Sequence, residues 1–189
     1  MKTKLSVLAI IFVLAMAAMA CGGSDKPVVN TPSGEQGEAV EETIPEVAVG
    51  SARSNPAPVG SEIIADDMAF VVLGVERSAD ATVAAGNMFN STPTADQEYI
   101  IVNLQVTCKK SSDEECSFTP DFSTEVIGDK GVSYSKEFVT GVPNEFQSST
   151  FYGGATVSGN LPFLVGKGET GLLLIYDPIF GDKFYLALP

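Results

Sequence analysis

The stretch that decides the fold is Glu98-Tyr-Ile-Ile-Val-Asn-Leu-Gln-Val-Thr-Cys-Lys-Lys110. From residue 100 onward every second side chain is apolar, and the positions between them include Asn103, Gln105 and Thr107. Successive side chains of a β-strand point to opposite faces of the sheet. The alternation therefore predicts a strand with one buried and one solvated face, and residues 155–165 repeat the pattern.

Shorter runs of β-forming residues lie on both sides of this strand, and clusters of Gly, Asp and Pro that favour turns separate them. The predicted strands cover residues 61–65, 68–76, 122–127, 132–135, 171–176 and 183–188. Residues 79–97 are too many for an ordinary hairpin connection, so we expect a mobile or locally folded insertion there. About seven or eight short strands with turns at this spacing predict an all-β fold, an antiparallel β-sandwich.

Core and turn residues at several places in the chain form motifs that go beyond simple alternation. They are Val59-Gly60-Ser61, residues 70–75, Tyr99 to Val106, residues 122–134 with the turn Gly128 to Gly131, residues 159–169, and Leu172 to Pro178. The set resembles an extracellular domain family of unknown function that bacterial lipoproteins often carry. This resemblance covers most of residues 59–189 and implies a telokin-like immunoglobulin fold, but it implies no particular function. One departure is the segment Cys108 to Cys116, which stands where the family has an Asn-rich turn.

The start of the chain resembles a secretion signal. Lys2 and Lys4 supply a short positive region, and residues 5–17 form an almost uninterrupted apolar run that ends in small residues. That run is shorter than the roughly 20 residues that a membrane-spanning helix needs. We therefore predict that residues 1–20 are a signal peptide.

The tetrapeptide Ala18-Met19-Ala20-Cys21 resembles the lipobox of bacterial lipoproteins, which are cut before the cysteine and acylated on its sulfur with chains such as palmitate. Lipid on Cys21 would hold the mature chain at a membrane or envelope surface, facing the extracytoplasmic side, because each buried acyl CH₂ contributes about 0.8 kcal/mol. The same residues also satisfy the A-x-A rule of ordinary signal peptidase. A secreted chain without lipid is therefore the alternative.

Residues 21–58 form an acidic linker rich in Pro, Gly and Ser. No apolar period persists there, so the segment cannot bury enough surface to offset its chain entropy, and we predict that it is disordered. Such a linker would average roughly 35 Å end to end. The predicted order is thus signal peptide 1–20, linker 21–58 and β-sandwich domain 59–189.

The three cysteines of the chain are an odd number, which matters for an exported protein. If Cys21 carries lipid, Cys108 and Cys116 remain as a pair, and we predict a disulfide between them. Their spacing is not C-x-x-C, which argues against a redox-active pair, and a zinc site would lack its other ligands.

The composition disfavours several classes of function. The formal net charge of −13 and the lack of a basic patch argue against binding to nucleic acid. The chain has no His and no Trp, so it lacks the usual general base, the commonest transition-metal ligand and the strongest stacking anchor for sugars or bases. We therefore expect no enzyme activity, no cofactor and no metal. A carboxylate-based enzyme would need a buried pair of acids at a pocket floor.

Local carboxylate clusters occur at Asp66-Asp67, at residues 113–115, and between Asp177 and Asp182. Calcium takes six to eight oxygen ligands, so two such clusters could in principle share an ion. None of them has the spacing of a known calcium loop, and solvated turns explain them better.

Four aromatic side chains in residues 136–154 are the candidates for a binding surface: Phe138, Phe146, Phe151 and Tyr152. Aromatic side chains in a loop can form a ligand-binding face, or they can plug the end of a sandwich, which is the commoner outcome.

The sequence as a whole predicts a membrane-anchored extracytoplasmic lipoprotein that displays a non-catalytic binding module. Its expected partners are the membrane, through the N-terminal lipid, and a protein or glycan of the envelope. The alternative is a structural or stress-related envelope protein without a specific ligand.

Overall fold

The computed structural model describes residues 28–30 and 48–189. The predicted signal peptide, the lipidation site Cys21 and the larger part of the predicted linker lie outside the described residues. Within the two described ranges, no helix is long and apolar enough to span a membrane. The elements are β1 (Val28–Asn30), β2 (Glu62–Ala65), β3 (Met68–Glu76), α2 (Asp80–Gly86), β4 (Gln97–Cys108), β5 (Glu115–Phe118), α3 (Pro120–Ser123), β6 (Thr124–Ile127), β7 (Ser133–Ser135), β8 (Ser149–Tyr152), β9 (Thr156–Gly166), β10 (Leu173–Tyr176) and β11 (Phe184–Ala187).

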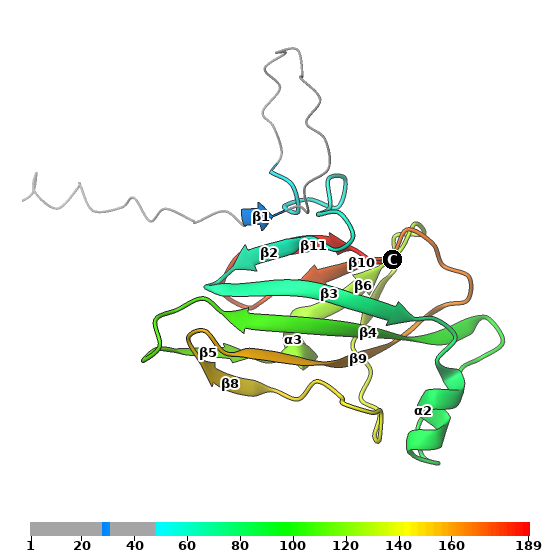
Figure 1. Ribbon diagram of the computed structural model, residues 1–189. Coiled ribbons are helices and arrows are strands. Elements are labelled where there is room, and N and C mark those ends of the chain that lie inside the picture. The colour runs from blue at the N-terminus through cyan, green and yellow to red at the C-terminus, as the bar shows by residue number, and fades with distance from the viewer. Residues whose placement is uncertain (1–27, 31–47) are drawn as a thin grey trace, which may run out of the picture.

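The strands form a layered β-sandwich (Figure 1). One layer is the five-stranded sheet β1-β2-β3-β4-β9, and the other is the four-stranded sheet β11-β10-β6-β7. β5 and β8 pair in a separate small sheet. Every pair of neighbouring strands is antiparallel. The prediction of an antiparallel, immunoglobulin-like sandwich is confirmed.

β4 lies inside the larger sheet, between β3 and β9, as its pattern predicts. The apolar side chains of Ile100, Val102, Leu104 and Val106 belong to the main core and are fully buried. Burying each of them stabilises the fold by about 1.5–3 kcal/mol. The strand that carries the clearest alternation is therefore also the one around which the core is built.

The other face of β4 is covered near the start of the strand, which the alternation does not predict. α2 lies inside the insertion 79–97, and its Val83 joins Tyr99, Ile101 and Val139 in a second apolar cluster. The insertion is thus locally folded, one of the two states expected for it. A seven-residue helix is too short to show a clear 3.6-residue period in the sequence.

An aromatic cluster fills the core between the two layers. The ring of Tyr176 lies 4.8 Å from that of Phe70 and 5.1 Å from that of Phe184, measured between centroids. Phe118 on β5 packs edge-on against Phe70 at 5.7 Å. These contacts tie β3, β5, β10 and β11 together, so the loops that leave these strands are fixed relative to one another.

The folded domain begins earlier than residue 59, the boundary that the sequence predicts. Ala57 is fully buried, and its backbone forms hydrogen bonds with Tyr185 and Ala187 of β11. Gly50 also accepts a hydrogen bond from Tyr185. Together with β1, this corrects the expectation of a linker that is disordered up to residue 58. The cause is pairing with distant strands, which leaves no periodic signal in so short a segment.

Candidate ligand-binding pocket

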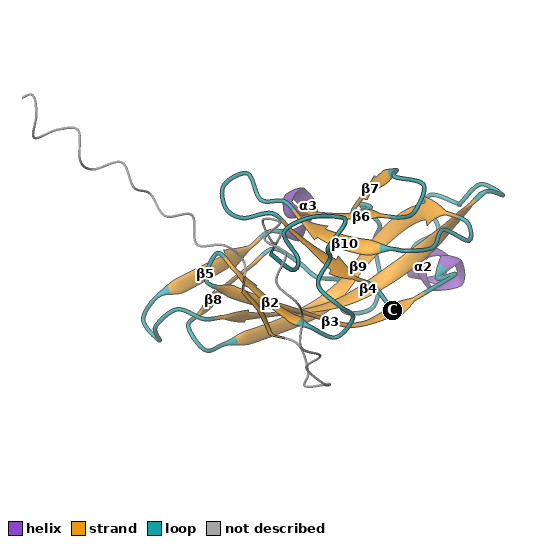
Figure 2. Ribbon diagram, turned by 90° about the horizontal axis from the view of Figure 1, so that it is seen from above, coloured by secondary structure: helices purple, strands orange, loops and turns teal. Residues whose placement is uncertain are grey.

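A pocket of about 510 Å³ opens where the β2–β3 turn, β5, α3 and the β10–β11 loop meet. β5 lies at the end of the sandwich opposite α2 (Figure 2). The side chains that line the pocket include Asp66, Ser117, Thr119, Phe122, Tyr176 and Phe180. Because these residues are far apart in sequence, only the tertiary fold brings them together.

Asp66 and Tyr176 provide the most polar part of the pocket wall. Asp66 and Asp67 form the tight β2–β3 turn with φ angles of 51° and 58°, a left-handed conformation that Asp tolerates better than most residues. The Tyr176 hydroxyl lies beside the Asp66 carboxylate and interacts with it. The backbone N–H of Asp182 donates to Asp66 Oδ1 at 3.3 Å, which brings the β10–β11 loop onto the turn.

The surroundings raise the pKa of both Tyr176 and Asp66. Burial and the nearby Asp66 carboxylate raise the pKa of Tyr176, so its hydroxyl remains a hydrogen-bond donor. Partial burial raises the pKa of Asp66, and the neighbouring carboxylates of Asp182 and Asp67 act in the same direction. A cationic group that enters the pocket would relieve this cost.

Apolar side chains flank the opening of the pocket. Phe122, Ile179 and Phe180 line it and are 73%, 82% and 91% exposed, respectively. Ligand pockets typically combine such apolar surface with a few converging polar groups. Ser117 and Thr119 add hydroxyl-bearing side chains to the wall. The pocket therefore suits a ligand that carries an apolar portion and a hydrogen-bond donor.

The four aromatic residues predicted as a binding surface do not form one. Phe146 and Phe151 are buried in the main core, so they plug the sandwich, which was the alternative expectation. Phe138 and Tyr152 are exposed. Phe138 lines a second pocket, which Tyr152 does not reach. In a segment without periodicity, the sequence contains no signal that separates the buried aromatic rings from the exposed ones.

The second pocket has a volume of about 340 Å³ and contains a buried lysine. Lys136 Nζ lies 2.7 Å from Asp121 Oδ1 and 3.1 Å from Glu145 Oε1. The ammonium group also lies 5.7 Å from the centre of the Phe138 ring. Two carboxylates already neutralise Lys136, so this network joins α3 to the loop between β7 and β8.

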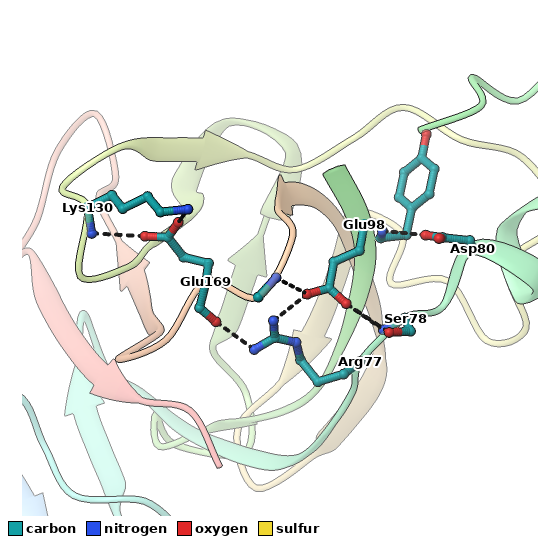
Figure 3. Close-up of polar contacts among 8 residues, drawn as sticks. Arg77, Ser78, Asp80, Glu98, Lys130 and Glu169 are labelled. Carbon is teal, nitrogen blue, oxygen red and sulfur yellow. Dashed lines mark hydrogen bonds and ion pairs between the residues drawn. The ribbon is translucent and has the colours of Figure 1, made fainter. Parts of the chain in front are cut away.

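Two further carboxylates, Glu98 and Glu169, are buried away from both pockets (Figure 3). Glu98 accepts hydrogen bonds from the Arg77 guanidinium, from Ser78 Oγ at 2.9 Å and from the Gly168 N–H at 3.1 Å. Burial alone would raise the pKa of Glu98, but these donors outweigh it and hold the pKa below its ordinary value. The carboxylate thereby ties the start of β4 to the β9–β10 turn.

Glu169 holds the β6–β7 turn in place through contacts with Lys130. Its Oε1 accepts from the Lys130 N–H at 2.9 Å, and its Oε2 lies 3.1 Å from Lys130 Nζ. Burial opposes ionisation of Glu169, yet the contacts with Lys130 lower its pKa. Arg77 links the two sites, because its Nη1 donates to the Glu169 carbonyl at 2.8 Å. Each buried acid thus has a basic partner and holds a turn in place.

Glu98 and Glu169 are not among the predicted site residues, although the sequence contains one signal for Glu169. Gly128 lies in a predicted turn. A Cβ atom at this position would lie 2.3 Å from Glu169 Cγ, so only glycine leaves room for the carboxylate side chain. The glycine indicates close packing, but only the fold shows which residue packs against it.

The disulfide between Cys108 and Cys116 is present, with the two Cα atoms 5.7 Å apart. It connects the end of β4 to β5, and Cys116 itself lines the Asp66 pocket. β5 pairs with β8, and both strands lie outside the predicted strand ranges. Among the residues that the structure describes, no group of three or more Cys, Asp or Glu side chains could hold a metal ion.

Three solved structures share the fold. The candidate lipoprotein ycdA of Bacillus subtilis superposes with a TM-score of 0.52 at 18% identity, over 67% of this chain and 38% of its own length. The yjhA protein of Bacillus subtilis superposes with a TM-score of 0.50 at 12% identity, over 70% of this chain and 98% of its own length. The secreted protein MPT63 of Mycobacterium tuberculosis superposes with a TM-score of 0.50 at 14% identity, over 70% of this chain and 96% of its own length.

This chain therefore matches less than half of the length of ycdA. At such low identities, the likeness to all three structures shows a common β-sandwich and nothing finer. A search of curated proteins found no match. The sequence itself carries a family assignment, because residues 57–185 match the family described as a domain of unknown function, DUF4352. The chain belongs to this family.

Proposed function

We propose that the protein is a lipid-anchored, extracytoplasmic binding module without catalytic activity, and that the Asp66 pocket is its ligand-binding surface. The observation that carries the proposal is the combination of a pocket of about 510 Å³, converging polar groups and an exposed apolar rim. Rigid β-sandwiches commonly present binding residues on the loops at one end.

Location outside the cytoplasm is supported by several independent features. The sequence combines a signal-like leader, a lipobox-like tetrapeptide ending at Cys21, and a disulfide between Cys108 and Cys116. Disulfides persist mainly in oxidising compartments. The similar folds of ycdA, which is a candidate lipoprotein, and of MPT63, which is secreted, are in keeping with this location.

The non-catalytic part of the proposal rests on the chemistry of the chain. There is no His, and the buried acids Glu98 and Glu169 are each engaged by a basic side chain away from the Asp66 pocket. Neither is placed to attack a ligand or to transfer a proton to it. Asp66 and Tyr176 suit binding, because they present an acceptor and a donor at one place.

Affinity capture from envelope extract tests the binding surface. The bait is the mature chain, residues 21–189, compared with an Ile179→Ser/Phe180→Ser variant. Loss of two apolar side chains that contact a ligand should weaken binding at least tenfold, since each buried side chain contributes about 1.5–3 kcal/mol. Met88 and Phe89 are 85% and 87% exposed beyond α2, so Met88→Ser/Phe89→Ser is the matched control.

The proposed surface is supported if a component binds the wild type and the control but not the pocket variant. Equal retention of all components by both variants would place the binding surface elsewhere. If nothing binds the wild type, a structural envelope protein without a ligand becomes the better description. The anchor is tested separately by mass spectrometry of the mature N-terminus, where an unmodified Cys21 would contradict lipidation.

A further inference from the structure

The direction of β1 sets which end of the domain lies near the lipidation site. β1 runs antiparallel to β2, with Val28 opposite Ile64 and Asn30 opposite Glu62. Ile64 is two residues before Asp66, which lines the pocket. The N-terminal end of β1 therefore points toward the end of the sandwich that holds β5, which Figure 1 shows, and β5 lines the pocket.

Side-chain contacts support this pairing. Asn30 Nδ2 donates to Glu62 Oε1 at 3.1 Å, and the Val29 side chain packs against the main core. Val29 also lies beside Gly50, where a Cβ atom would be 3.4 Å from Val29 Cγ2. The strand is thus held by backbone, polar and apolar contacts together.

The short connection from Cys21 to Val28 limits how far the pocket can be from the membrane. Seven residues of fully extended chain reach about 25 Å, since each spans at most roughly 3.6 Å. A linker that is free up to residue 58 would reach about 130 Å by the same measure. Docking of β1 therefore replaces a long tether with a short one and keeps the pocket end as the end nearer to the anchor.

That orientation brings an exposed apolar surface toward the lipid. Ile179 and Phe180 lie in the β10–β11 loop, and Phe122 on α3 lies beside the same opening. We propose that the loop from 178 to 181 inserts Ile179 and Phe180 into the headgroup region of the bilayer that holds the Cys21 lipid, so that the pocket opens onto that membrane. This inference rests on the proposed anchoring at Cys21.

The carboxylates at the pocket end of the domain favour a bilayer without net negative charge. Asp66, Asp67 and Asp182 lie together there, and none of them forms an ion pair with a Lys or Arg within the described residues. Lys110 is the basic residue that lines the pocket. An excess of carboxylates repels anionic lipid and attracts ammonium groups. The partner surface is therefore a bilayer of zwitterionic, amine-bearing lipid.

The chain has no Trp, so a single introduced indole reports its own surroundings without background. The experiment uses the mature chain, residues 21–189, with the Cys108–Cys116 disulfide closed. Cys21 is then the free thiol, and it is coupled to a maleimide lipid in vesicles of phosphatidylcholine and phosphatidylethanolamine. The F180W variant carries the probe at the pocket end, and F89W carries it at the α2 end as the control.

In vesicles whose acyl chains carry bromine, the F180W indole should lose most of its emission, and in unbrominated vesicles its spectrum should shift to shorter wavelength. The F89W indole should do neither. Emission of F180W that is the same with and without bromine would overturn the proposal. Equal quenching of both probes would also overturn it, because the domain would then have no fixed orientation.

Two further measurements test whether β1 pairing and lipid charge cause the insertion. Val29→Pro removes a backbone donor of β1 and should reduce quenching of F180W severalfold, because the tether lengthens. Unchanged quenching would show that β1 does not orient the domain. Replacing phosphatidylcholine with phosphatidylglycerol should also reduce quenching at low salt. Because maleimide coupling supplies the anchor, these results are separate from mass spectrometry of the native Cys21, which alone tests natural lipidation.

Discussion

The Tyr176 hydroxyl lies beside the Asp66 carboxylate and interacts with it, while the centre of the Tyr176 ring lies 4.8 Å from that of Phe70 in the aromatic core. One side chain therefore connects the centre of the sandwich to the polar part of the pocket. This connection fixes the β2–β3 turn and the end of β10 relative to each other.

Tyr176→Phe keeps the ring in the core and removes only the hydroxyl. Loss of this polar contact should lower the free energy of unfolding by about 1 kcal/mol. It should also raise the pKa of Asp66 further, because the hydroxyl favours the ionised carboxylate. Chemical denaturation and NMR titration of the Asp66 carboxyl group measure the two effects. Tyr152→Phe, on the exposed side of β8, is the control, because it removes a hydroxyl that contacts a different carboxylate, that of Glu115. An Asp66 titration unchanged in Tyr176→Phe would contradict the contact.

Asp66→Asn should stabilise the fold slightly at pH 7, by less than about 1 kcal/mol because the group is largely exposed. The folded pKa of Asp66 is raised, so the charged form is the costly one and its cost appears as the pH rises through that pKa. Asn also tolerates the positive φ at this position. The gain in the free energy of unfolding should vanish near pH 3, as denaturation curves can measure. A gain that does not depend on pH would mean that Asn stabilises the backbone conformation of the turn instead.

Glu98→Gln should destabilise the protein at pH 7 by about 2 kcal/mol, because Arg77 loses its charged acceptor. The folded pKa of Glu98 is lowered, so its stabilisation is complete above the ordinary pKa of 4.5 and is lost as the pH falls through the folded value. The difference between wild type and variant should therefore shrink in acid. Urea denaturation from pH 7 to pH 2.5 measures this, with the exposed Asp113→Asn as control.

Gly128→Ala should destabilise the fold by about 1–3 kcal/mol, because the new methyl group would overlap the Glu169 side chain. Gly74→Ala is the matched control, since no heavy atom lies within 4 Å of the Cβ position there. Thermal denaturation compares the two variants. Equal melting temperatures would mean that Glu169 can leave its site without cost.

Replacement of both Cys108 and Cys116 by Ala should lower the free energy of unfolding by roughly 2–3 kcal/mol, the chain-entropy value for so short a loop. Because Cys116 lines the Asp66 pocket, the β5 wall should also become more mobile. Urea denaturation gives the first quantity, and hydrogen exchange of the Ser117 amide gives the second. Reduction of the wild type with dithiothreitol should reproduce both effects, and its failure to do so would assign them to the substitutions.

The sequence by itself determined the fold class, because a strand buried on one face repeats its chemistry every two residues. This is why β3 and β4 could be located to within a residue or two, and why Gly and Asp marked the turns between strands. Cysteine parity similarly predicted the pair Cys108 and Cys116. These features are local or follow from counting, so they need no knowledge of distant neighbours.

Only the tertiary structure decided where the polar groups meet. Asp66 and Tyr176 are 110 positions apart in the chain. Glu98 and Gly168 are separated by 70 residues. Such contacts depend on how strands from distant parts of the chain are placed side by side, and they leave no periodic trace at either residue. The same holds for β1, whose three residues pair with β2 because a free sheet edge offers unpaired backbone groups.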